Sequence, residues 1–159
     1  MPFLDLLSPE HVRAQFVATD KGNLLERLAG LLATDPDEEQ VIAAALLQRE
    51  RLGSTGIGRG VAIPHARIEG ISEVRAALIQ LAKPMAFDAI DGQAVDLVAA
   101  MVVPEHSPEQ HLHLLAELAE LFSNAELTAA MRRAEDGSAL REELADFVRN
   151  KTQSPTWID

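Results

Sequence analysis

Apolar residues recur at helical spacing near the N-terminus and again over the last third of the chain. After Asp20, a candidate N-cap, a run of leucines predicts a helix that ends near Ala33. A second helix is predicted from about Glu38, where negative charge suits the first turn, to Leu52, with Gly53 as its stop. The remaining predicted helices cover residues 109–122, 124–134 and 138–150.

Between the helices lie apolar runs that are typical of strands. Residues 12–18 alternate loosely, and residues 61–65 form a short run that ends beside a proline. Residues 75–81 and 95–103 are longer, and the last run is almost continuously apolar, which predicts a central strand covered on both faces. We therefore predict an α/β fold: a single compact domain with a mixed central β-sheet flanked by helices on both faces.

Length and composition fit one folded domain. The chain has 159 residues, of which 47% are hydrophobic and 25% charged, an ordinary balance for a globular protein. We expect the domain to span residues 1–151, and residues 152–159 to form a frayed C-terminal tail. The chain has no cysteine, which excludes disulfides, thiolate metal sites and cysteine nucleophiles.

Charge and hydropathy limit the partners. The formal net charge is −11, so the protein repels phosphate backbones and is not expected to bind nucleic acid. The first seven residues lack a basic region and include Asp5, so they do not form a signal peptide. The longest apolar run, residues 97–104, is too short to cross a bilayer. We expect a cytoplasmic protein without membrane insertion.

The segment from Gly53 to Gly60 is the first candidate for chemistry. Four glycines in eight residues argue against a regular element and allow backbone N–H groups to approach an anion. The hydroxyls of Ser54 and Thr55 add hydrogen-bond donors. The segment lacks the lysine of a Walker A loop, and its order of helix, glycines and strand does not fit the dinucleotide-binding fingerprint. A plain connection is the other interpretation of the same residues.

Two of the five histidines have informative positions. His65 follows a proline at a predicted strand end beside the glycine segment, a place where sites occur in open α/β sheets. His111 shares a predicted helix face with apolar residues, whereas His113 falls on the acidic face of the same helix. The alternative interpretations are a surface histidine after a turn and a hydrogen-bonded core histidine.

Two other kinds of site find little support in the spacing. His111 and His113 cannot converge on one helix face, and no matching cluster supplies further ligands, so we predict no metal site. The chain has no Gly-x-Ser-x-Gly elbow of a serine hydrolase. A nucleophilic Ser54 beside His65 remains open without further support.

Taken together, these segments resemble a known family. Gly53-Ser54-Thr55-Gly56-Ile57-Gly58 followed by Ala62-Ile63-Pro64-His65 closely resembles the active-site signature of the fructose/mannitol class of phosphotransferase-system IIA domains. The segments Phe87-Asp88-Ala89-Ile90-Asp91-Gly92 and His111-Leu112-His113 look like the nitrogen-regulatory branch in particular. The resemblance covers the chain from about Leu7 to Asn150.

The resemblance implies a reaction and its residues. In the family, the histidine of the Ile-Pro-His motif accepts a phosphoryl group, and it corresponds to His65. The motif arginine corresponds to Arg49, whose planar fork matches phosphoryl oxygens, and the second histidine to His111. The residues expected to complete a phosphate-binding cradle are Ser54, Thr55 and Gly56. The implied protein is a stoichiometric phosphohistidine carrier without cofactors that is phosphorylated by an HPr-like histidine phosphocarrier protein.

Three functions stay open on the sequence. The first is a nitrogen-branch regulator whose phosphorylation state governs partners, which in the family include potassium transport proteins and sensor kinases. The second is a sugar-transport IIA component that passes phosphate to a fructose/mannitol-type IIB domain. The third is an interaction module that is never phosphorylated. A chain of one domain, without an appended IIB domain or membrane segment, favours the first; the set Arg49, Ser54, His65 and His111 disfavours the third.

Overall fold

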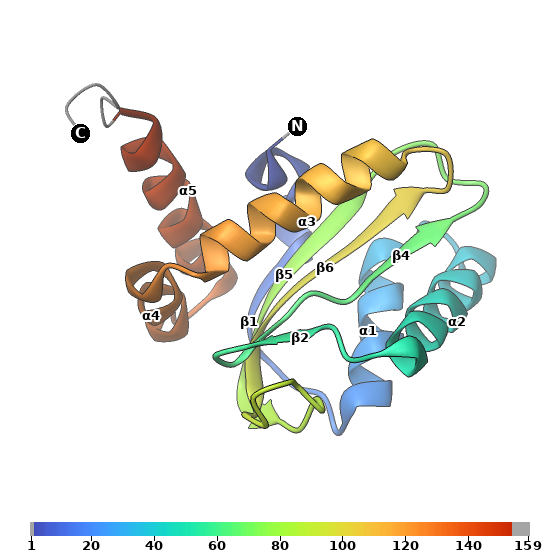
Figure 1. Ribbon diagram of the computed structural model, residues 1–159, viewed down its shortest axis with the longest axis horizontal. Helices are drawn as coiled ribbons and strands as arrows, with labels where there is room; N and C mark the ends of the chain where they lie inside the picture. The colour runs from blue at the N-terminus through green and yellow to red at the C-terminus, as the bar shows by residue number, and fades with distance from the viewer. Residues whose placement is uncertain (1, 154–159) are drawn as a thin grey trace.

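Six strands form one mixed sheet in the computed structural model, which describes residues 2–153 (Figure 1). Their order across the sheet is β1-β5-β6-β3-β2, and β4 pairs with β6 beyond the end of β3. β5 and β6 are antiparallel, whereas β1 runs parallel to β5, and β3 and β4 run parallel to β6. The strands are β1 (Val12–Phe16), β2 (Gly56–Gly58), β3 (Val61–Ala62), β4 (His65–Ile68), β5 (Arg75–Met85) and β6 (Val95–Pro104).

Helices cover both faces of this sheet, which confirms the predicted fold class. One face carries α1 (Lys21–Leu32) and α2 (Pro36–Leu52). The other carries α3 (Pro108–Phe122), α4 (Ala125–Arg133) and α5 (Gly137–Gln153), together with a 3₁₀ turn at Phe3–Leu6; a second 3₁₀ turn, Pro9–His11, precedes β1. Within residues 2–153 none of the helices has the length and hydropathy needed to cross a membrane.

Local signals explain where the first two helices begin. The predicted cap is confirmed, because the Asp20 carboxylate accepts the N–H of Asn23 at 2.8 Å. The Asp35 carboxylate caps α2 in the same way, and Pro36 stands at the first helical position, where its missing N–H costs nothing.

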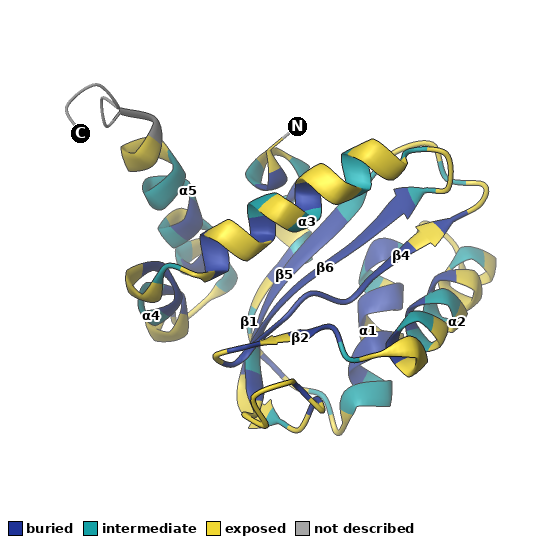
Figure 2. Cartoon of the chain, in the orientation of Figure 1, coloured by how far each residue is buried: buried dark blue, intermediate teal, exposed yellow. Residues whose placement is uncertain are grey.

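The core lies on both sides of β5 and β6 because alternate residues of a strand face opposite ways. Leu78 and Met101 pack beneath α3, α4 and α5, whereas Ile79 and Val98 pack beneath α1 and α2. Figure 2 shows these central strands as buried, with exposed residues on the outer faces of the helices. The prediction of a central strand at residues 95–103 is confirmed.

The predicted strand 61–65 is wrong in one respect that matters for the site. The chain forms two strands here, β3 and β4, separated by Ile63 and Pro64. Proline has no N–H to donate, so the ladder is interrupted, but the Pro64 carbonyl still accepts the Met101 N–H at 3.0 Å. His65 therefore begins a strand that continues along β6, and does not end one.

The glycine segment is also more regular than predicted. Residues 56–58 pair antiparallel with β3, so a short hairpin stands where the sequence indicates an irregular loop. A side chain at Gly56 is excluded, because its Cβ would lie 2.8 Å from the Cβ of Ala89. Gly58, with φ of 98°, adopts the backbone that glycine favours.

The C-terminal boundary differs slightly from the prediction. α5 continues to Gln153, two residues into the segment expected as a frayed tail. Residues 154–159, on which the rest of that prediction falls, lie outside the described residues.

Candidate functional site

A cavity of about 410 Å³ lies where the end of α2, the start of β4 and the start of α3 meet. It brings together three of the predicted site residues, Arg49, His65 and His111. Its lining residues are Ala45, Gln48, Arg49, Leu52, His65, Ala66, Arg67 and His111.

His65 is held in one tautomer at the start of β4. Its side chain is buried, and Nδ1 lies 2.6 Å from the carbonyl oxygen of Ile63. A carbonyl only accepts hydrogen bonds, so Nδ1 carries the proton and Nε2 keeps its lone pair. Burial lowers the pKa of His65 below its usual value of 6.5, and the Arg49 charge acts in the same direction. These effects outweigh the hydrogen bond to Ile63 and the Glu50 charge, which raise the pKa. His65 is thus a neutral imidazole at pH 7.

His111 faces His65 from the first turn of α3. The two ring centroids are 5.0 Å apart, with the ring planes inclined at 65°. Burial lowers the pKa of His111 to about 4, and the electrostatic coupling to the His65 ring and the charges of Arg67 and Arg49 act in the same direction. Among the described residues, the buried Nε2 of His111 has no hydrogen-bond partner. A buried polar atom without a partner is uncommon and has capacity for a ligand.

The helix-face prediction for the two histidines is confirmed. His111 is half-buried beside the cavity, whereas His113 is exposed two residues further along α3. The face of α3 that packs on the sheet includes Leu114, Leu118 and Phe122, all of them buried.

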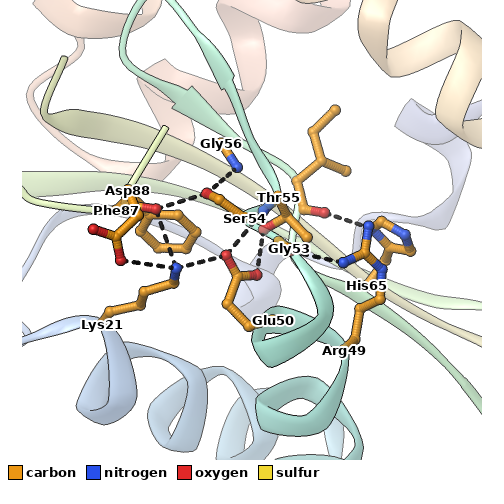
Figure 3. A network of polar contacts seen from close by, with 11 residues as sticks. Lys21, Arg49, Glu50, Gly53, Ser54, Thr55, Gly56, His65, Phe87 and Asp88 are labelled. Atoms are coloured by element: carbon orange, nitrogen blue, oxygen red, sulfur yellow. Dashed lines mark hydrogen bonds and ion pairs between the residues drawn. The ribbon is translucent and has the colours of Figure 1, made fainter. Parts of the chain in front are cut away.

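Two arginines give the cavity a positive charge within a protein of net charge −11. Arg49 stands in the last turn of α2, where its Nη1 donates to the Gly53 carbonyl at 2.8 Å (Figure 3). Arg67 lies on β4 two residues after His65 and therefore on the same side of the strand. The sequence motifs do not identify Arg67 or Gln48 as site residues, although the two-residue spacing from His65 is a usable signal for Arg67.

The structure does not bring Ser54, Thr55 and Gly56 into the cavity. The Ser54 hydroxyl donates to the Phe87 carbonyl at 2.6 Å and accepts the Gly56 N–H at 3.0 Å. The N–H and hydroxyl of Thr55 both donate to the buried Glu50 carboxylate, at 2.8 and 2.7 Å. These groups are already hydrogen-bonded within the protein, so the cradle that the sequence suggests is not formed in this structure.

Comparison with known proteins assigns the chain to a family. Residues 5–147 match the family described as phosphoenolpyruvate-dependent sugar phosphotransferase system, EIIA 2. The chain belongs to this family. Among its relatives, the nitrogen regulatory protein of Pseudomonas aeruginosa is 37% identical over 143 residues, which cover 89% of this chain and 93% of that protein. The fructose-specific EIIA component of Haloferax volcanii is 30% identical over 112 residues, covering 70% and 73% of the two chains.

Structural comparison agrees with the nitrogen-regulatory branch. The crystal structure of nitrogen regulatory protein IIA-Ntr from Neisseria meningitidis superposes with a TM-score of 0.81 at 34% sequence identity. The match covers 89% of this chain and 97% of that one. This EIIA protein is therefore similar to the nitrogen regulatory IIA proteins in both fold and sequence, as the segments at residues 87–92 and 111–113 predict.

Proposed function

We propose that this EIIA protein is a nitrogen-branch regulatory phosphocarrier that accepts a phosphoryl group on Nε2 of His65 from a histidine phosphocarrier protein. One observation carries the proposal: the cavity contains a buried imidazole whose Nδ1 is hydrogen-bonded to the Ile63 carbonyl. Arg49 and His111 line the same cavity, and Nε2 of His111 has no hydrogen-bond partner within residues 2–153.

The reaction balances without a cofactor. The lone pair on Nε2 of His65 attacks the phosphorus held on a histidine of the carrier, and a new N–P bond forms. The N–P bond on the carrier breaks, and its electron pair returns to the carrier imidazole. The proton on Nδ1 of His65 stays in place, hydrogen-bonded to the Ile63 carbonyl, so the phosphorylated ring is an imidazolium whose charge is offset by the phosphoryl oxygens. The carrier ring, protonated on its other nitrogen before transfer, leaves as a neutral imidazole, so no separate acid or base is required.

Arg49 and His111 take complementary roles in this proposal. Phosphoryl transfer passes through a loose transition state, so alignment and charge stabilisation supply most of the catalysis. The Arg49 fork binds the phosphoryl oxygens, and the neutral His111 donates from Nε2 to one of them. Arg67 adds positive charge at the cavity edge.

Phosphorylation would also change the charge of the surface that partner proteins contact. A phosphoryl group adds negative charge and acceptor oxygens to a cavity that two arginines otherwise make positive. Partner proteins that distinguish the two states, such as potassium transport proteins or sensor kinases, would read that change. A cytoplasmic site of action is part of the same proposal.

Mass measurement after in vitro phosphorylation tests the assignment. The protein is incubated with phosphoenolpyruvate, the upstream enzyme and the histidine carrier, and its intact mass is compared with that of His65→Ala. Wild type should gain one acid-labile phosphoryl group, and His65→Ala none, while His113→Ala serves as the exposed-histidine control. Labelling that survives in His65→Ala contradicts the assignment, and no labelling of wild type favours an interaction module.

A sugar-transport role is the second candidate, favoured by the similarity to a fructose-specific EIIA component. Phosphorylated protein mixed with a fructose-type IIB domain would then pass on its phosphoryl group. Retention of the label on His65 would favour the regulatory function.

A further inference from the structure

A carboxylate that the mechanism does not use lies behind the cavity. Glu50 follows Arg49 in the last turn of α2, yet it is only 8% exposed. A negative charge is unfavourable both in the last turn of a helix and in a buried position. Glu50 is fully engaged: Oε1 accepts the Thr55 N–H, Oε2 accepts the Thr55 hydroxyl, and Lys21 Nζ lies 2.9 Å from Oε1 (Figure 3).

Lys21 ties this carboxylate to a second segment of the chain. Its ammonium donates to the Phe87 carbonyl at 3.1 Å and lies 4.6 Å from the centre of the Phe87 ring. The same carbonyl accepts the Ser54 hydroxyl. Phe87 therefore holds Ser54 and Glu50 holds Thr55, and Lys21 at the start of α1 links Phe87 to Glu50.

A continuous path of short contacts leads from Glu50 to His65. Glu50 binds Thr55, and the Thr55 carbonyl accepts the Ile63 N–H at 2.9 Å. The Ile63 carbonyl in turn accepts the proton on Nδ1 of His65. Two residues before Thr55, the Gly53 carbonyl holds the guanidinium of Arg49.

We propose that Glu50, with Lys21 as its counter-ion, is a positioning residue for phosphoryl acceptance: it fixes Thr55 so that the Ile63 carbonyl keeps the proton on Nδ1 of His65. The nucleophilic lone pair is thereby kept on Nε2, and the same anchored segment holds Arg49 beside the cavity. This proposal rests on the proposed function of His65 for its effect on transfer, but the positioning itself is a property of the unphosphorylated protein.

The tautomer of His65 tests the positioning directly. Imidazole ¹⁵N chemical shifts of the unphosphorylated protein should show a protonated Nδ1 in wild type. Glu50→Gln keeps the shape of the side chain but removes its charge, and with it the shorter of the two ion pairs of Lys21; the other, to Asp88, is 3.8 Å long. This variant should show a mixture of the two His65 tautomers, because the Ile63 carbonyl is no longer held in place.

Transfer kinetics supply the second readout. Glu50→Gln should lower the rate of phosphoryl acceptance about tenfold while the KM for the carrier stays unchanged, since alignment is lost and docking is not. Thr55→Val should show a smaller loss, because the Thr55 N–H still binds Glu50 when the hydroxyl is gone.

Glu38→Gln is the matched control. Glu38 is also a carboxylate of α2, paired with Arg75 at the far end of the helix from the cavity. Its loss should lower thermal stability without changing the His65 tautomer or the transfer rate.

Two results overturn the positioning role. One is a Glu50→Gln protein that folds and keeps His65 wholly in the Nδ1-protonated form. The other, if Glu50→Gln does not fold, is Thr55→Val with both the tautomer and the transfer rate of wild type. Failure of wild type to accept phosphate would instead refute the proposed function and leave the tautomer result standing.

Discussion

The two sides of the segment from Arg49 to His65 differ in how completely their polar groups are hydrogen-bonded within the protein. On the cavity side, His111 has a buried nitrogen without a partner among the described residues, and His65 keeps a lone pair on Nε2. On the opposite side, Ser54 and Thr55 are fully engaged with Phe87 and Glu50. His65, Ser54 and Thr55 belong to one sequence motif, and only their contacts distinguish their roles.

This difference indicates which residues react and which hold them. Polar groups that already have hydrogen-bond partners within the protein have no capacity left for a ligand. Their hydrogen bonds instead fix the backbone around them. An unsatisfied polar atom costs free energy, and a ligand that hydrogen-bonds to it removes that cost. Substitutions on the cavity side should therefore change transfer, and substitutions of Ser54 should change stability.

Arg49→Lys should have the largest effect on transfer. Lysine keeps the charge but loses the planar fork, so phosphoryl acceptance should slow about 10- to 100-fold, equivalent to about 1.4–2.8 kcal/mol of transition-state stabilisation. The thermal midpoint should not change. Single-turnover kinetics with the phosphorylated carrier measure the rate, and an unaltered rate would make Arg49 an ordinary helix-end cation.

Ser54→Ala should show the opposite pattern. The Ser54 hydroxyl donates to the Phe87 carbonyl and accepts the Gly56 N–H. Its loss should therefore lower the free energy of unfolding by about 1–2 kcal/mol. Phosphoryl acceptance should stay within about twofold of wild type. Denaturant unfolding and the same kinetic assay separate the two quantities; a large loss of transfer with unchanged stability would return Ser54 to the phosphate-binding cradle.

His111→Ala should leave His65 able to accept phosphate, but it should shorten the lifetime of the phosphorylated form about three- to tenfold, because one donor to the phosphoryl oxygens is lost. His111→Gln places an amide donor near the original Nε2 position and should restore much of that lifetime. His113→Ala is the exposed control and should behave as wild type. Equal lifetimes for His111→Ala and His113→Ala would contradict the role of the inward face.

Acid should destabilise the protein through the same buried histidine. Because the pKa of His111 is lowered to about 4, the unfolded chain binds a proton near pH 6.5 while the folded chain does not. Stability is therefore complete above pH 6.5 and is lost as the pH falls toward 4. Between pH 6.5 and 5, wild type should lose about 1 kcal/mol more than His111→Gln, measured by denaturant unfolding at each pH.

Sequence patterns predict a structural feature reliably where only one local structure is compatible with the pattern. Helical spacing located α1 to α5 and separated His111 from His113, because a three- to four-residue period admits only one buried face. Local patterns could not show that Pro64 interrupts a strand without ending it, since β6 continues alongside the break. The close approach of Gly56 to Ala89, which is 33 residues away in the chain, likewise arises only in the fold.

The role of Glu50 also cannot be predicted from sequence patterns, because it depends on contacts that form only in the fold. An acidic residue in the last turn of a helix is an electrostatic anomaly that signals a special environment, but it does not identify the partner. The partners, Lys21 and Thr55, lie on either side of Glu50 in the chain and meet it only in the fold.

The position of the phosphoryl group on the imidazole ring of His65 tests the account most directly. Phosphorylated wild type, labelled with ¹⁵N at its histidines, would be compared by NMR with the unmodified protein. The contact between Nδ1 and the Ile63 carbonyl predicts that phosphorus is bonded to Nε2 of His65 and that Nδ1 remains protonated. Phosphorus on Nδ1 of His65, or on any other residue, would contradict it.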